Sequence, residues 1–205
     1  TGSIASGKSL ISRYLKNKGY KVIDSDLISH NVLLLSEAKE KIVNIFSDKV
    51  LNNNNEIDRK VLGSIIFNST TEKNKLQEIV FPYILEEINK QIKENEGLIF
   101  LDAPLLIEYN LLYLVDKVIV VKADLNTQIN RLMLRDNITK EYALKKIQSA
   151  LSSEEKEKYG TDLPQNLYPF RYGSGLLRQA EAFLAALLCP GSGRQALHPA
   201  GCGLW

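Results

Sequence analysis

The sequence predicts an α/β fold in which helices cover both faces of a parallel sheet. Two continuous apolar runs carry this prediction, Leu98–Leu101, which Gly97 and Asp102 bound, and Val118–Val121. Runs of this kind are typical of strands that are buried on both faces. They alternate along the chain with segments whose apolar residues have helical spacing, which is the pattern of a doubly wound α/β domain.

Length and composition are those of one soluble globular domain. The chain has 205 residues, of which 44% are hydrophobic and 24% charged, and this excludes a disordered or fibrous protein. The net charge of +2 is too balanced to indicate nucleic-acid binding, and no apolar run is long enough to span a membrane. Cys189 and Cys202 lack metal-binding or redox spacing, so we expect a cytoplasmic protein.

The predicted elements follow one another closely in the first part of the chain. A helix is expected over Lys8–Asn17 and a short strand over Tyr20–Ile23. From Leu27 to Asn95 the apolar spacing is helical, with breaks at Asn52–Asn55 and near Asn68–Thr71. We therefore expect a largely helical region between the first strand and the strand at Leu98–Leu101.

The composition changes after Gly160. Residues 161–205 contain no Lys, Ile or Val, but they hold both cysteines and the only Trp. A natural linker rarely loses these three residue types together, so we interpret 161–205 as an anomalous tail, foreign or frame-shifted, with a natural extension as the alternative. One helix is predicted in it, from about Leu176 to Leu188, because Pro190 follows.

A glycine-containing loop near the start predicts phosphate binding. Residues 2–9 read G-S-I-A-S-G-K-S and match the pattern G-x-x-x-x-G-K-[ST] in full. In such a loop the backbone N–H groups and the N-terminus of the next helix surround phosphate oxygens. Lys8 is expected to reach the β- and γ-phosphates, and Ser9 to ligate Mg²⁺. The residues expected to contact the nucleotide are Gly2, Ser3, Ile4, Ala5, Ser6, Gly7, Lys8, Ser9 and Leu10.

Three aspartates lie where predicted strands end, at the edge of an α/β sheet that binds ligands. Asp26 is predicted to accept the proton of an attacking hydroxyl group. Asp24 either faces the same site or caps the next helix. Asp102 ends the strand Leu98–Leu101, and is either an acid that organises Mg²⁺ or a turn residue.

Five segments, in this order, resemble the dephospho-coenzyme A kinase family. They are the phosphate loop, V-I-D-S-D at 22–26, E-I-D-R-K-V-L-G at 56–63, P-L-L-I-E at 104–108 and R-L-M-L-R-D at 131–136. The resemblance covers about residues 1–160 and implies a three-layer P-loop kinase fold. It places a helical coenzyme A-binding insertion at about 27–95 and a mobile lid at about 131–158. Because a buried strand precedes the phosphate loop in this fold, we expect the first strand to be missing here.

The resemblance implies transfer of the ATP γ-phosphoryl group to the ribose 3′-hydroxyl of dephospho-coenzyme A, the last step of coenzyme A synthesis, with ATP and Mg²⁺ required. Its expected catalytic residues are Lys8, Asp26 as general base, and Arg135 as a lid contact to ATP. Asp26, Arg59 and Asp102 are the expected substrate contacts. Arg59 is equally well placed for an ion pair with Glu56 or Asp58. For Arg135 a solvated helix face is the alternative to an ATP contact.

Two alternatives to this activity remain open. One is another small P-loop kinase that acts on a nucleoside or nucleotide, and the other is an inactive truncated fragment. A GTPase is disfavoured because no Asn-Lys-x-Asp segment is found. The expected partner is a small molecule, dephospho-coenzyme A, with neither nucleic acid nor membrane, and the oligomeric state is not predicted.

Overall fold

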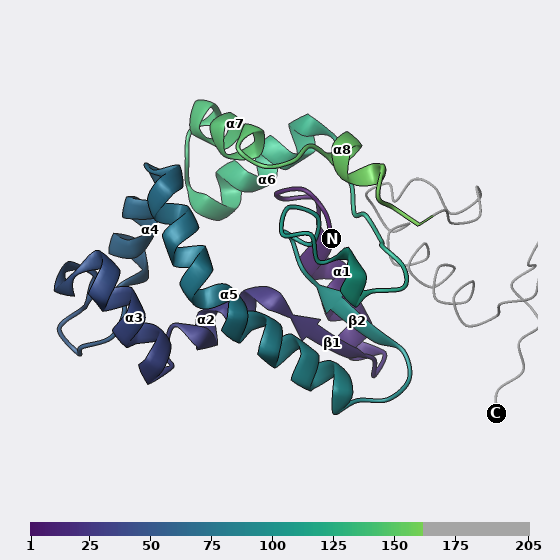
Figure 1. The fold of residues 1–205 in the computed structure, drawn as a ribbon. Helices are drawn as coiled ribbons and strands as arrows, with labels where there is room; N and C mark the ends of the chain where they lie inside the picture. The colour runs from purple at the N-terminus through teal and green to yellow at the C-terminus, as the bar shows by residue number, and fades with distance from the viewer. Residues whose placement is uncertain (162–205) are drawn as a thin grey trace, which may run out of the picture.

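The computed structural model describes residues 1–161, which form a parallel sheet surrounded by helices (Figure 1). The predicted helix after the phosphate loop is confirmed with its bounds. In chain order the elements are α1 (Lys8–Asn17), β1 (Lys21–Asp24), α2 (Ser25–Val32), α3 (Ser36–Phe46), η1 (Asp48–Val50), α4 (Arg59–Phe67), α5 (Thr70–Lys93), β2 (Ile99–Asp102), η2 (Leu112–Leu114), α6 (Leu125–Asp136), α7 (Lys140–Gln148) and α8 (Ser153–Glu157).

Strands β1 and β2 pair in parallel and confirm two of the predicted strands. Their register sets Lys21 opposite Ile99 and Asp24 opposite Asp102. Both strands therefore end at the same edge of the sheet, and each ends in an aspartate. From this edge the chain continues from β1 into α2 and from β2 into the turn at 103–110.

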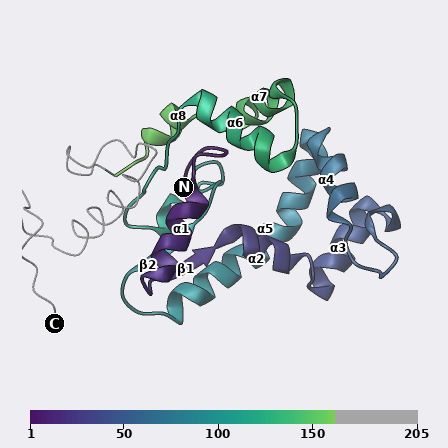
Figure 2. The same ribbon diagram turned by 180° about the vertical axis from the view of Figure 1, so that it is seen from behind.

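Alternate side chains of the two strands pack against helices on opposite faces of the sheet. Val22 and Phe100 contact the core that α1 supplies, whereas Ile23 and Leu101 belong to the core of α2 and α5. Figure 1 is viewed from the α5 side, and Figure 2 shows α1 on the reverse side. The predicted three-layer α/β arrangement is thus confirmed, because side chains of a strand point alternately to its two faces.

Val118–Val121 does not form the predicted strand. Only Val121 is paired, in a single parallel bridge to Gly2. Two backbone hydrogen bonds accompany it, from Val121 N to Thr1 O at 3.0 Å and from Thr1 N to Ile119 O at 2.9 Å. An extended segment becomes a strand only through a continuous ladder of such bonds. Within residues 1–161 this one has isolated contacts only, to Thr1 and Gly2 at one end and between Val118 and Thr161 at the other. The missing first strand itself stays a prediction.

Helices α2 to α5 form the helical region predicted between the two strands. Helices α2, α3 and α4 all pack on the long helix α5. Their shared core includes Ile28, Ile42, Leu62 and Ile88. The break between α3 and α4 covers the predicted Asn52–Asn55 loop.

Helices α6 to α8 lie over the phosphate loop and cover the region predicted as the lid (Figure 1). Ile129 and Leu132 of α6 pack with Ala143 of α7, and Ile4 and Ala5 of the phosphate loop contact this small core. None of the helices in residues 1–161 combines the length and apolar character needed to cross a membrane. The predicted tail helix at 176–188 lies outside the described residues, and the domain boundaries stay predictions.

Candidate active site

The phosphate loop, residues 2–9, joins the start of the chain to α1 and has two positions that require glycine. A Cβ atom on Gly2 would lie 2.6 Å from the carbonyl oxygen of Val121, closer than real Cβ contacts come. Gly7 has φ of 103° in the left-handed region and directly precedes α1. The loop therefore turns sharply into the helix, so the first N–H groups of α1 point toward whatever occupies the loop.

A cleft of about 500 Å³ opens in front of this loop. Residues 2–9 line one wall, and Asp26 of α2 borders the cleft from the sheet edge. The lid contributes Arg131 and Arg135 from α6 and Lys146 from α7. Segments far apart in the sequence thus bring a loop of backbone N–H groups, one carboxylate and several cations to a single space.

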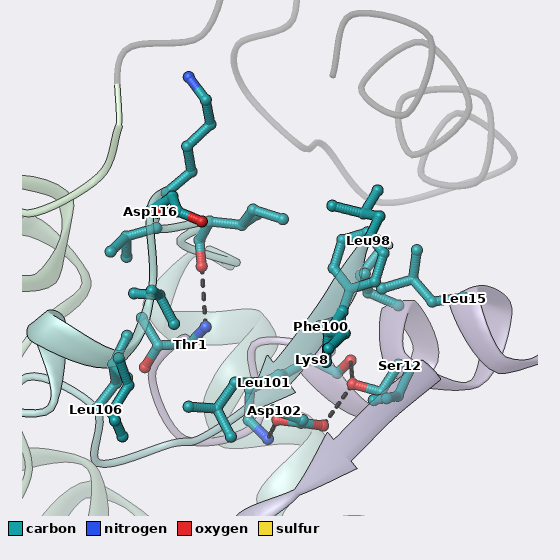
Figure 3. A pocket seen from close by; sticks show the side chains of 18 of the residues that line it. Thr1, Lys8, Ser12, Leu15, Leu98, Phe100, Leu101, Asp102, Leu106 and Asp116 are labelled. Carbon is teal, nitrogen blue, oxygen red and sulfur yellow. Dashed lines mark hydrogen bonds and ion pairs between the residues drawn. The ribbon is translucent and has the colours of Figure 1, made fainter. Parts of the chain in front are cut away.

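Lys8 and Asp102 form an ion pair beneath the phosphate loop. The Lys8 ammonium donates to Oδ1 of Asp102, and Ser12 Oγ donates to Oδ2 of the same carboxylate (Figure 3). The Asp102 side chain is only 7% exposed, so this pair is largely screened from water. Asp102 therefore positions Lys8 at the end of β2. Lys8 and Asp102 also border a second cavity of about 470 Å³, whose other walls are mainly apolar. Its lining side chains are drawn in Figure 3.

Asp26 lies in the first turn of α2 and borders the cleft. Desolvation by the surrounding protein raises the pKa of its carboxyl group, and the nearby positive charge of Lys8 only partly opposes this. A carboxylate with a raised pKa binds a proton more readily, which suits a proton acceptor. Asp24 has a different role. Its Oδ1 accepts a hydrogen bond from Leu27 N at 3.1 Å, so Asp24 caps the N-terminus of α2.

The lid cations are held by hydrogen bonds. Arg131 Nη1 donates to the carbonyl oxygen of Ala5 in the phosphate loop at 2.8 Å. Asp136 accepts from Arg135 Nε at 2.7 Å and from Lys146 Nζ at 2.9 Å. These two donors, Arg135 first, lower the pKa of Asp136 to about 2, so it is ionised at neutral pH. Asp136 therefore keeps two cations side by side at the rim of the cleft.

Three of the predicted site residues do not line this cleft, namely Leu10, Arg59 and Asp102. Arg59 is exposed at the start of α4, and its Nη1 donates to Nδ1 of His30 at 3.2 Å. Asp102 lies behind Lys8, as described above. The structure thus groups Lys8, Asp26 and Arg135 with the loop and leaves Arg59 near α2, on the helical insertion.

Sequence reasoning did not assign a role to Ser12, Lys146 or Lys156. Ser12 lies one helical turn after Lys8, so the i,i+4 spacing was the available signal for a shared partner. Lys146 and Lys156 lie among many lysines of similar spacing, and nothing in the sequence distinguishes them. In the described part of the chain, no cluster of three or more His, Cys, Asp or Glu side chains is arranged to hold a metal ion.

A phosphate loop at the carboxyl edge of a parallel sheet, facing a carboxylate and the cations of a helical lid, defines a P-loop kinase. Comparison with known proteins narrows this class. The model of the dephospho-CoA kinase family matches residues 1–167. The chain belongs to the dephospho-CoA kinase family.

Individual relatives agree with this assignment. A Bacillus cereus dephospho-CoA kinase is 42% identical over 171 residues, which are 81% of this chain and 86% of the relative. The Fusobacterium nucleatum dephospho-CoA kinase is 41% identical over 160 residues, which are 77% of this chain and 82% of the relative.

Solved structures share the fold. A crystal structure from Thermus thermophilus has a TM-score of 0.78 at 27% identity and covers 94% of this chain and 96% of that one. The dephospho-CoA kinase from Campylobacter jejuni has a TM-score of 0.65 at 29% identity, and the match covers 91% of this chain and 94% of that one.

Proposed function

We propose that this chain transfers the γ-phosphoryl group of ATP to the ribose 3′-hydroxyl of dephospho-CoA and so forms coenzyme A. The observation that carries the proposal is the shared cleft, which joins the phosphate loop, Asp26 and the lid cations in a member of this family. The reaction moves a phosphoryl group between two small molecules and releases ADP, and we place it in the cytoplasm, as the cysteine pattern favours.

Phosphoryl transfer depends mainly on positioning and on neutralising charge. The N–H groups of the phosphate loop and the N-terminus of α1 hold the phosphates of ATP. Lys8, oriented by Asp102, balances charge on the β- and γ-phosphates, and Arg135 approaches them from the lid. We assign Lys8 and Arg135 the stabilisation of the transferring group.

Asp26 takes the proton of the attacking 3′-hydroxyl. Asp26 lies in the first turn of α2 and borders the same cleft as the phosphate loop. Its raised pKa means that proton transfer to this carboxylate is less unfavourable than to an ordinary aspartate. Arg59 remains a proposed contact to the acceptor phosphates, farther out on the insertion.

Mg²⁺ is expected to enter with ATP. The hydroxyl of Ser9 and the carboxylate of Asp26 border the same cleft, and oxygen donors of this kind suit Mg²⁺, which is commonly held by one or two protein ligands and the phosphates of the substrate. When bound, the ion neutralises charge on the β- and γ-phosphates. Ser9 is the residue that we propose as its ligand.

The proposal is tested by offering the protein ATP with dephospho-CoA, adenosine or AMP as acceptor, and by locating the new phosphate by phosphorus NMR. We expect phosphorylation of dephospho-CoA alone, at the 3′ position. We expect Lys8→Ala to lower the rate by about a hundredfold or more, because it removes a charge that stabilises the transition state. The exposed Arg13 of α1 provides a matched control, since Arg13→Ala leaves the cleft intact. Phosphorylation of adenosine or AMP in preference to dephospho-CoA would favour the rival kinase activity.

A further inference from the structure

Lys156 of α8 is a buried cation that none of the steps above uses. Its side chain is 2% exposed, yet it borders the same cleft as the phosphate loop. Burying an ammonium group is unfavourable unless it is paired and hydrogen-bonded. Lys156 meets both conditions, because Nζ lies 2.8 Å from Oε1 of Glu108 and donates to the carbonyl oxygen of Pro104 at 2.6 Å.

The carbonyl oxygen of Pro104 joins Lys156 to the start of the phosphate loop. Thr1, which directly precedes the loop, donates from Oγ1 to this same oxygen at 3.0 Å. Lys156 and Thr1 therefore share one acceptor on the turn that follows β2. This turn also contains Glu108, so Lys156 holds both ends of the 104–108 segment.

A second contact from α8 reaches the loop itself. Ser153 lies three residues before Lys156, on the same face of the helix. Its Oγ is 2.7 Å from Oγ of Ser3, and both serines are buried. At the other end of the lid, Arg131 of α6 bonds to Ala5 of the same loop. The lid is thus attached to the phosphate loop at both of its ends.

We propose that Lys156, through Glu108 and the Pro104 carbonyl, is a positioning residue that fixes the phosphate loop relative to the lid. This inference rests on the proposed function, since it concerns the phosphoryl transfer in the same cleft. Lys156 acts through the 104–108 turn and through α8. Removing its ammonium group keeps the side chains of Lys8 and Arg135 but allows the distance between them to vary. Displacements near 1 Å in such sites lower rates by as much as a hundredfold.

The test compares Lys156→Met, which keeps the unbranched stem, with Lys158→Met, an exposed lysine at the end of the same helix. For Lys156→Met we expect kcat to fall tenfold to a hundredfold, while the KM for dephospho-CoA changes less than threefold. We also expect hydrogen exchange of the amides of residues 2–10 to become at least tenfold faster in the absence of ligands. Lys158→Met is expected to match the wild type in each measurement.

The double variant Lys156→Met with Glu108→Gln separates positioning from folding. It removes the carboxylate charge that Lys156→Met leaves without its partner, so we expect Tm to recover toward that of the wild type. If kcat stays low and exchange stays fast in this double variant, the positioning role is supported. If kcat recovers together with Tm, or if loop exchange is unchanged in both variants, the role is overturned. A wild-type protein inactive on dephospho-CoA contradicts the proposed function alone, because the exchange measurement still decides the role of Lys156.

Discussion

At the scale of single residues, the site depends on two aspartates with opposite environments. Asp102 is buried and paired with Lys8 and Ser12, so it serves to orient a cation. Asp26 borders the cleft, and desolvation raises the pKa of its carboxyl group. Both aspartates follow predicted strands in the sequence, and only the fold distinguishes the acid that holds Lys8 from the acid that faces the substrate.

The raised pKa of Asp26 has a consequence for stability. In the folded protein the ionised carboxylate is less favourable than in the unfolded chain, so Asp26 lowers the free energy of unfolding above its raised pKa. This destabilisation disappears as the pH falls below the ordinary pKa of an aspartate. Because Asp26 is partly open to water, which screens its charge, we expect Asp26→Asn to raise Tm only slightly at pH 7, by about 1 °C or less, and the difference to vanish in acid.

Calorimetry at pH 7 and at pH 3 measures both parts of this prediction. Asp124, an exposed carboxylate that caps α6, provides the contrast. Its pKa is lowered by hydrogen bonds from Thr127, so Asp124→Asn should lower Tm at pH 7. A Tm for Asp26→Asn that lies below the wild-type value at pH 7 would contradict our account of this residue.

At the scale of elements, capping aspartates and serines place the helices that carry the site. Asp58 accepts hydrogen bonds from Lys60 N at 2.8 Å and from Val61 N at 3.2 Å, and so begins α4. Arg59 is the first residue of that helix. The direction of the Arg59 side chain therefore depends on the cap, since a frayed first turn does not hold it near His30.

We expect Asp58→Ala to lower the free energy of unfolding by about 1 kcal/mol, the usual effect of losing such a cap. If Arg59 contacts the acceptor, the KM for dephospho-CoA rises severalfold while the KM for ATP is unchanged. Urea denaturation and steady-state kinetics measure the two effects. Asp58→Ser keeps a capping side chain and should resemble the wild type. An equal rise of both KM values would argue against a role for α4 in binding the acceptor alone.

At the scale of the whole molecule, the region predicted as the insertion contacts the region predicted as the lid. Phe67 at the end of α4 contacts Tyr142 of α7, with ring centroids 6.4 Å apart. Figure 1 shows that these helices approach each other above the sheet, on the side of the phosphate loop. Both rings are substantially exposed, so the contact adds little to the core.

We expect Phe67→Ala to raise the KM for both substrates up to about fivefold with little change in kcat. An aromatic contact of this kind contributes at most about 1 kcal/mol, and it favours the arrangement in which both parts surround the substrates. Combining it with Tyr142→Ala in a double-mutant cycle measures the coupling. Leu34→Ala, an equally exposed apolar truncation beyond α2, is the control. Additive effects of the two aromatic truncations would show that the contact does not contribute to binding.

Much of this architecture could be predicted from the sequence, because the signals are local. The phosphate loop, α1, β1, β2 and the helical insertion follow from spacing and from glycine positions in short windows. Val118–Val121 was the exception, since a strand requires partners that no local pattern reveals.

The site was predictable only in part, for a related reason. Lys8 and Asp26 belong to recognisable motifs, whereas the ion pair of buried Lys156 with Glu108 joins residues 48 positions apart. The separation of such pairs in the sequence has no characteristic spacing. The packing of α8 against the turn after β2 creates the pair, so it becomes visible only in the folded chain.

The central claim is that the cleft transfers a phosphoryl group with Asp26 as the proton acceptor. Its most direct test is the pH dependence of kcat/KM for dephospho-CoA at saturating ATP, in the wild type and in Asp26→Asn. We expect wild-type activity to fall as the pH drops through a pKa above the usual range of aspartate. Asp26→Asn should be slower by about a hundredfold or more and should lack this acid limb. A variant that keeps both the wild-type rate and the same acid limb would contradict the account.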